Sequence, residues 1–156
     1  MTDSAAREKE ETHLFEADMT WSGDGSGCGK LHMPQGDISI DIGGSKKIGG
    51  CGVGANPEEL LLGAVGACFI NTWAIFLKKL NIPYAEPSVR VTGTLGKDPA
   101  GGYRMQDMTV HARVPAPLMA EQETQLEKTL QLAEKYCIIS KVTKTAMPMK
   151  VAVEEV

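Results

Sequence analysis

Aromatic side chains and cysteines are both scarce in this sequence. Phe, Trp and Tyr together make up 5% of its 156 residues, so a core has to be built mostly from aliphatic side chains and methionine. Four cysteines are too few to staple a secreted disulfide scaffold, and a chain of this length does not need such staples in order to fold. We therefore expect the thiols to be reactive, metal-bound or simply buried.

An excess of positive charge is also missing. Lys and Arg number 16 against 20 Asp and Glu, which gives a net charge of -4 and a pI near 5.4. A dedicated nucleic-acid binder usually carries a basic stripe or a pI above about 9, so we expect no nucleic-acid partner. The polar N-terminus, residues 1–11, has no apolar run and no cleavage site. It predicts a flexible tail, not a signal peptide, and a cytoplasmic protein.

The longest apolar run extends from Leu60 to Leu77, where 18 residues pass without a charge. That length reaches the lower limit of a membrane-spanning helix. Gly63, Gly66 and Asn71 dilute the run, however, and the mean hydropathy of the whole chain is -0.14. A helix that is apolar on every side is equally suited to the centre of a core. We therefore predict a central core helix and no membrane partner.

Helix-start signals stand immediately before this run. Asn56 is a good N-cap, Pro57 suits the first helical position, and Glu58 and Glu59 favour the positive end of the helix dipole. We predict a helix over residues 57–80.

The rest of the chain shows strand periodicity, with one further amphipathic helix. We predict a single domain over residues 12–156 with the order β-β-β-α-β-β-α-β. Two helices against antiparallel sheets belong to the α+β class, not to the doubly wound α/β class. The predicted strands cover residues 13–21, 30–33, 37–42, 88–96, 103–114 and 147–153, and the second helix covers 121–136, with one more helical turn at 138–143.

The cysteines fall into two groups. Cys68 and Cys137 lie in helical contexts, where a cysteine is usually just a small buried hydrophobe, and spacing alone does not show that they meet. Cys28 and Cys51 lie in glycine-rich loops. These two are open to three interpretations: a metal site with His32, which lacks the paired CxxC spacing of strong zinc motifs; a redox role for Cys28; or no catalytic role.

Two segments carry a resemblance to a known family. Residues 56–69, NPEELLLGAVGACF, resemble the first cysteine motif of the OsmC/Ohr family of thiol-dependent hydroperoxide reductases, and residues 133–141, AEKYCIISK, resemble its second. The resemblance implies an OsmC-like fold in which antiparallel sheets wrap a long central helix in an intertwined homodimer. The apolar helix supports a dimer independently, because one small sheet and one other helix can hardly cover all of its faces.

The resemblance also implies a reaction. Cys68 would attack an organic hydroperoxide as a thiolate and become a sulfenic acid, Cys137 would resolve it as a disulfide, and an external dithiol would complete the cycle. No metal, haem or flavin cofactor is implied. Substrate access along Leu61, Phe69 and Ile138 would favour alkyl peroxides. In the family an arginine supplies positive charge beside the reactive cysteine, and Glu58 would position it.

The sequence departs from the family pattern at that arginine. Residues 22–33, SGDGSGCGKLHM, hold none where one is expected. Lys30 and Cys28 lie in this turn and are the possible supporting residues, although a lysine lacks the guanidinium fork. Ile138 also replaces the proline of the second motif. Two alternatives therefore stay open: a non-catalytic thiol sensor or small-molecule binder, and a redox-inert structural homodimer.

Overall fold

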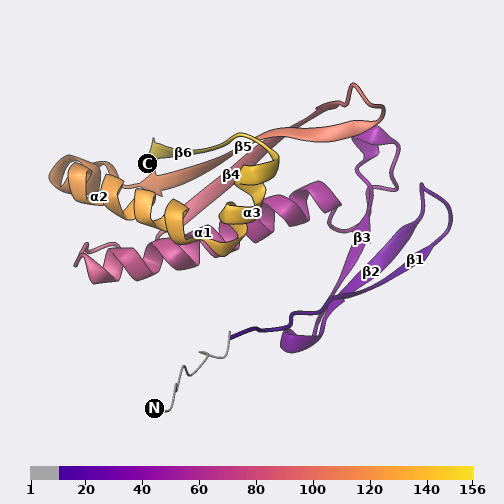
Figure 1. Ribbon diagram of the computed structural model, residues 1–156, viewed down its shortest axis with the longest axis horizontal. Coiled ribbons are helices and arrows are strands. Elements are labelled where there is room, and N and C mark those ends of the chain that lie inside the picture. Colours follow the sequence, from indigo (N-terminus) through magenta and orange to yellow (C-terminus); the bar gives the residue numbers. More distant parts are fainter. Residues whose placement is uncertain (1–10) are drawn as a thin grey trace, which may run out of the picture. The chain divides into compact units, whose positions relative to one another are not determined.

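The computed structural model describes residues 11–156 (Figure 1). The tail predicted for residues 1–11 lies outside this range apart from its last residue. Contacts divide the chain into two compact units, residues 1–56 and residues 57–156. The single domain predicted from residue 12 onward stays a prediction. Element order and class agree with the predicted α+β fold, with one helix added near the C-terminus.

The first unit is a three-stranded antiparallel meander. Its strands are β1 (Asp18–Ser22), β2 (Cys28–Met33) and β3 (Ile38–Gly43), and they lie in the order β1-β2-β3. Short 3-10 turns follow β2 and β3, at Pro34–Gly36 and Lys46–Ile48. The alternation expected from residue 13 becomes a strand only at Asp18.

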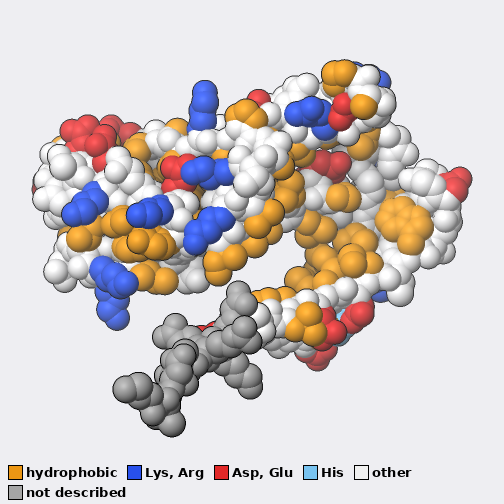
Figure 2. Space-filling model, viewed as in Figure 1, with side chains coloured by type: hydrophobic (Ala, Val, Ile, Leu, Met, Phe, Trp, Pro, Cys, Tyr) orange, Lys and Arg blue, Asp and Glu red, His pale blue; other side chains and the backbone are white. Residues whose placement is uncertain are grey.

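Side chains alternate between the two faces of this sheet, and one face is apolar. The register places Met19 opposite Leu31 and Leu31 opposite Ile40, so all three point to the same side. Leu31 is buried, whereas Met19 is 62% exposed. Hydrophobic side chains also gather over this sheet in Figure 2. The apolar face, as the term is used below, consists of Met19, Trp21, Leu31, Met33, Ile38, Ile40 and Ile42.

A disulfide between Cys28 and Cys51 closes the loop that follows β3, and it corrects the expectation that no cysteine would be bridged. The two Cα atoms are 6.3 Å apart, within the usual range for a disulfide. Gly43 is the strand partner of Cys28, and a Cβ atom at that position would collide with the Cys51 sulfur. Gly43 is therefore needed to make room for the bridge.

Backbone hydrogen bonds hold the same loop in place. The Gly52 N–H donates to the Gly44 carbonyl at 2.9 Å, and the Ala55 N–H donates to the Asp41 carbonyl at 2.9 Å. Ala55 also forms an isolated parallel bridge with Ile42. The segment that leads into the first helix is thus ordered, although its glycine content predicts an irregular loop.

The second unit combines three helices with a three-stranded sheet in the order β4-β5-β6 (Figure 1). Strands β4 and β5 form the predicted hairpin, but β6 pairs with β5 in parallel, so this sheet is mixed and not antiparallel. The chain returns to the sheet through two helices and therefore enters β6 in the direction of β5. The elements are α1 (Pro57–Lys79), β4 (Ser88–Lys97), β5 (Tyr103–Val114), α2 (Ala116–Tyr136), α3 (Ile138–Ala146) and β6 (Met149–Glu155).

The second long helix begins earlier than predicted. Helix α2 starts at Ala116, with Pro115 as its N-cap, and contains a kink at Gln122. Pro115 and Pro117, which lie between the predicted strand and the predicted helix, are compatible with a first helical turn, because their missing N–H would have no partner there anyway.

The core of this unit is centred on α1. Phe69 and Trp73 are fully buried and pack with residues of β5 and α2, including Val110 and Leu126. The Trp73 indole N–H donates to the Thr129 hydroxyl at 2.9 Å, and that hydroxyl donates to the Leu126 carbonyl at 2.7 Å. The polar end of the tryptophan is therefore satisfied inside the core.

Helix α1 is buried on one side only within its own unit. It is long and apolar enough to cross a membrane by length and composition, and 28% of its most apolar 18-residue window is buried. A core helix of a soluble protein passes the same test. Ile75, on the open side, is 46% exposed. The predicted central core helix is thus partly covered by the described part of the chain.

The disulfide gives a testable outcome. Protein purified without reductant and denatured should show two thiols that react with Ellman's reagent, because only Cys68 and Cys137 are free. A tryptic map should show Cys28 linked to Cys51. Replacing Cys51 by serine should add Cys28 as a reactive thiol and lower the free energy of unfolding by about 2–4 kcal/mol. Four reactive thiols in the unreduced parent protein would contradict the bridge.

Candidate active site

Cys68 lies about three turns into α1 and is half-buried. Its backbone carbonyl accepts a hydrogen bond from the Thr72 hydroxyl at 2.8 Å. The residue lines a cavity of about 600 Å³ between α1 and the region where α2 passes into α3. The other lining residues are Asn71, Thr72, Ile75, Phe76, Lys79, Leu132, Tyr136 and Ile138. Cys68 is thus within reach of a small molecule from solvent.

The wall of this cavity is mostly apolar. Phe76 and Tyr136 stack with ring centroids 5.6 Å apart, and Ile138 is 72% exposed at the cavity surface. The ammonium group of Lys79 lies 5.4 Å from the centroid of the Phe76 ring. Lys79 follows Cys68 by three helical turns, about 16 Å along the axis, so it lies far from the thiol.

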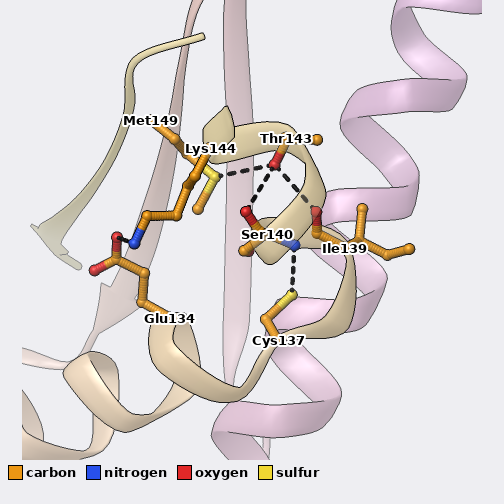
Figure 3. A network of polar contacts seen from close by, with 7 residues as sticks. All are labelled: Glu134, Cys137, Ile139, Ser140, Thr143, Lys144 and Met149. Carbon is orange, nitrogen blue, oxygen red and sulfur yellow. Dashed lines mark hydrogen bonds and ion pairs between the residues drawn. The ribbon is translucent and has the colours of Figure 1, made fainter. Parts of the chain in front are cut away.

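Cys137 lies at the junction of α2 and α3 and is fully buried. Its N–H donates to the Ala133 carbonyl at 2.8 Å, which ends α2. Its sulfur accepts the Ser140 N–H at 3.4 Å and so acts as the N-cap of α3 (Figure 3). One residue thus closes one helix with its backbone and opens the next with its side chain.

The two free thiols are neighbours. Burial raises the pKa of the Cys137 thiol above its ordinary value, and Cys68 raises it further, through a hydrogen bond and through charge. Ser140 acts in the opposite direction through its side chain and its N–H. Cys68 also packs against the hydrophobic cluster that contains Cys137. The structure therefore brings together a pair that sequence spacing left unresolved.

Glu58 lies in the first turn of α1, as predicted, and one of its carboxylate oxygens has no partner among the described residues. Its Oε2 atom is buried and has no hydrogen-bond partner within residues 11–156. Ten residues of continuous helix separate Glu58 from Cys68, which corresponds to about 15 Å along the axis. This carboxylate and the Cys68 thiol of the same chain are thus well separated.

The predicted supporting residues lie in the first unit and are engaged there. The Lys30 ammonium forms an ion pair with Asp41 at 2.7 Å on the polar face of the sheet. Cys28 is bonded to Cys51, so neither sulfur is a free redox thiol in this structure. His32 shares a hydrogen bond of 3.0 Å with the Ser39 hydroxyl. The metal-site interpretation loses both of its sulfur ligands to the disulfide.

The expected path for substrates needs correction. Phe69 is fully buried in the core, and Leu61 packs against that core, so neither lines the cavity beside Cys68. Ile138 does line it. The rest of the apolar wall is formed instead by Ile75, Phe76, Leu132 and Tyr136, of which Phe76 and Tyr136 form a ring pair.

Sequence reasoning missed one residue of the site, Ser140. It is fully buried, three positions after the N-cap cysteine. The signal was present in the spacing, because a residue at this position commonly exchanges hydrogen bonds with the N-cap. We expected a single helical turn at residues 138–143, and the importance of its third residue was not apparent.

Comparison with known proteins identifies a matching family and related sequences. The family described as OsmC-like protein matches residues 49–152 of this chain. The organic hydroperoxide resistance protein-like 1 of Staphylococcus epidermidis is 30% identical over 128 residues, which cover 82% of this chain and 88% of that protein. Its counterpart in Staphylococcus saprophyticus is 33% identical over 91 residues, which cover 58% of this chain and 62% of that protein.

Solved structures share the fold. A crystal structure of an organic hydroperoxide resistance protein OsmC from Legionella pneumophila matches with a TM-score of 0.73 and 20% identity, over 92% of this chain and 99% of that one. The organic hydroperoxide resistance protein OhrB of Bacillus subtilis matches with a TM-score of 0.66 and 24% identity, over 91% and 100% of the two chains. The family match and the agreement of fold lead to one conclusion: this chain belongs to the OsmC-like family.

Proposed function

We propose that the protein reduces organic hydroperoxides with the thiol pair Cys68 and Cys137. The observation that carries this proposal is the arrangement of the pair, in which a half-buried thiol faces a cavity and its neighbour is buried behind it. The relatives named as organic hydroperoxide resistance proteins support the same activity.

The reaction proceeds in three balanced steps. The Cys68 thiolate attacks the terminal peroxide oxygen, the O–O bond breaks, and the alkoxide leaves and takes a proton, giving an alcohol and a sulfenic acid. The Cys137 thiolate then attacks the sulfenic sulfur, and hydroxide leaves and is protonated to water as the disulfide forms. An external dithiol reduces this disulfide to two thiols and is itself oxidised to a disulfide.

The lining of the cavity selects the substrate class. The wall formed by Ile75, Phe76, Leu132, Tyr136 and Ile138 is apolar and gives hydrogen peroxide few polar partners. An alkyl or aryl group gains from contact with the same wall. Organic hydroperoxides are therefore the preferred substrates, and no metal, haem or flavin takes part. Reduction by an external dithiol suits a reducing compartment, which for this protein is the cytoplasm.

The working unit is a homodimer. The apolar face of the first unit includes Met19, Trp21 and Ile38, which are 62%, 48% and 51% exposed. In the second unit, Ile138 at the Cys68 cavity is 72% exposed, and Val142, four residues farther along α3, is 66% exposed. Exposed apolar area of this kind marks an interaction surface, and a second copy of the chain covers it.

Glu58 contributes to the site from the other chain of this dimer. About 15 Å of helix separates it from Cys68 of its own chain, so it cannot act on that thiol. Its Oε2 atom has no partner among residues 11–156, and in the dimer a donor of the partner chain satisfies it. The family arginine is missing, so Lys30 is the residue whose place in the sequence suits it to supply the positive charge near Cys68. To do so, Lys30 would have to leave its ion pair with Asp41.

Cumene hydroperoxide and a small dithiol test the activity. The parent protein should consume peroxide catalytically, and Cys68→Ser should reduce consumption to the uncatalysed rate. Cys137→Ser should consume about one equivalent and then stop as a sulfenic acid that dimedone traps. Ala74→Ser, on an exposed position of the same helix, is the matched control and should keep the parent rate. A parent rate equal to that of Cys68→Ser would favour the thiol sensor or binder instead.

Mixing of two variants tests the contribution of Glu58. Alone, Glu58→Gln should lower the turnover rate about tenfold or more, which corresponds to about 1.4 kcal/mol of lost transition-state stabilisation. When Glu58→Gln and Cys68→Ser are unfolded and refolded together in equal amounts, half of the dimers combine the two, and each holds one intact site. About a quarter of the parent activity should return. Failure to recover any activity would place Glu58 in its own chain's site or outside the site.

Sedimentation equilibrium tests the dimer itself. The parent should sediment at twice its 16.7 kDa chain mass at micromolar concentration. Replacing Ile138 by Asp on the exposed apolar surface should shift the equilibrium toward the monomer by about tenfold or more, because a charge would then be buried. Replacing the exposed Thr145 by Asp on the same helix is the control. A parent protein that is monomeric at all accessible concentrations would contradict the proposal.

A further inference from the structure

The hydroxyl group of Ser140 is buried without an ordinary hydrogen-bond partner. Ser140 has no exposed surface, and its Oγ atom has no partner within residues 11–156. Buried hydroxyls are nearly always hydrogen-bonded, so an orphaned one calls for an explanation. Ser140 lies on α3, and its backbone N–H donates to the Cys137 sulfur at 3.4 Å (Figure 3).

The local backbone offers this hydroxyl no acceptor or donor. A side chain at the third helical position often bonds the N–H of the N-cap residue, but the Cys137 N–H already donates to Ala133 at 2.8 Å. The Ser140 carbonyl lies within 3.4 Å of the Thr143 hydroxyl, which also donates to the Ile139 carbonyl at 3.2 Å. The group on which the Ser140 side chain acts is the Cys137 thiol, whose pKa it lowers.

Burial disfavours a negative charge on the Cys137 sulfur, but its place at a helix N-terminus acts in the opposite direction. Cys137 is the N-cap of a nine-residue helix, whose N-terminal dipole stabilises an anion. The Ser140 N–H points at the sulfur, and the first turn of α3 carries no acidic residue. Both the side chain and the N–H of Ser140 lower the pKa of Cys137, against the larger raising effect of burial.

Few other charges act on this sulfur. Among the described residues, Cys68 of α1 is the one other titratable group that affects the pKa of Cys137, which it raises. Glu134 of α2 and Lys144 of α3 flank the junction, and they are paired with each other at 2.7 Å. Ser140 is therefore the chief group that favours the ionised form.

We propose that Ser140 is a positioning residue whose hydroxyl donates a hydrogen bond to the Cys137 thiolate. This inference rests on the proposed peroxidase function only for the step at which the thiolate is needed. Beside the neutral Cys137 thiol, the Ser140 hydroxyl has no hydrogen-bond acceptor. It gains the thiolate as an acceptor when the sulfur ionises, because hydrogen bonds to an ionised acceptor are shorter and stronger.

The hydroxyl acts at two points of the cycle. It stabilises the Cys137 thiolate as that sulfur attacks the sulfenic acid of Cys68 and hydroxide leaves. It acts again when an external thiolate attacks the half-exposed Cys68 sulfur of the disulfide, because the S–S bond then breaks and Cys137 leaves as the thiolate. The second thiol of the reductant displaces Cys68 from the mixed disulfide and completes the exchange.

The test is a pH titration of Cys137 in protein labelled with 13C at cysteine Cβ, in a Cys68→Ala background. Cys137 is then the one free thiol, so its Cβ signal reports its ionisation directly. Adding Ser140→Ala should raise the titration midpoint and leave about three- to tenfold less thiolate at a given pH, a shift of roughly 0.5 to 1 pH unit. The melting temperature should stay the same or rise, because the deleted hydroxyl has no partner.

Thr143→Val is the matched control. It removes another buried hydroxyl of α3, one that is bonded to two backbone carbonyls and to the Met149 sulfur, and not to the Cys137 sulfur. It should lower the melting temperature and leave the titration of Cys137 unchanged. The proposal is overturned if Ser140→Ala leaves the midpoint in place or lowers it, or if Thr143→Val moves it equally.

A second measurement separates this inference from the peroxidase proposal. With Cys68 present, one equivalent of cumene hydroperoxide should give a sulfenic acid that dimedone traps for about three- to tenfold longer in Ser140→Ala than in the parent protein. If the parent forms no sulfenic acid, the peroxidase proposal fails, whereas the titration still decides the role of Ser140. If Ser140→Ala shows a shifted titration of Cys137 but the parent's sulfenic acid lifetime, Ser140 does not contribute to the resolving step.

Discussion

The packing of α1 against the α2–α3 junction is the constraint on which the site depends. Phe69 and Trp73 anchor one stripe of α1 in the core, and the indole bond to Thr129 fixes the helix against α2. Cys68 precedes Phe69 directly and therefore falls at the edge of that stripe, half-buried. Cys137 lies at the point where α2 ends. Helix packing, and not any local sequence motif, brings the two sulfurs together.

The two sulfurs of the pair have unequal surroundings, and the inequality suits a division of roles. Cys68 faces a cavity with an apolar wall, whereas Cys137 is enclosed and relies on its own helix for polar contacts. A buried thiol is normally a poor nucleophile because burial disfavours the thiolate. The N-terminus of α3 and Ser140 offset that effect in part. Cys68 thus needs a path for the substrate, and Cys137 needs nearby groups that stabilise its thiolate.

Much of the fold could be predicted because its signals are local. Capping residues and the apolar run placed α1 to within one residue at its C-terminal end, and β5 occupies its predicted residues. The direction of β6 could not be predicted, because it depends on how two helices return the chain to the sheet. The same holds for the site: Cys68 and Cys137 were identified by resemblance, whereas their proximity and the part of Ser140 emerge only from tertiary packing. The Cys28–Cys51 bridge has no local signal, because strand pairing and an irregular loop create it together.

The bridge depends on Gly43 as well as on the two cysteines. The sulfur of Cys51 occupies the volume where any other residue at position 43 would carry its first side-chain carbon. Even an alanine there would displace the loop and separate the half-cystines. Three positions, and not two, therefore decide whether the cross-link can form.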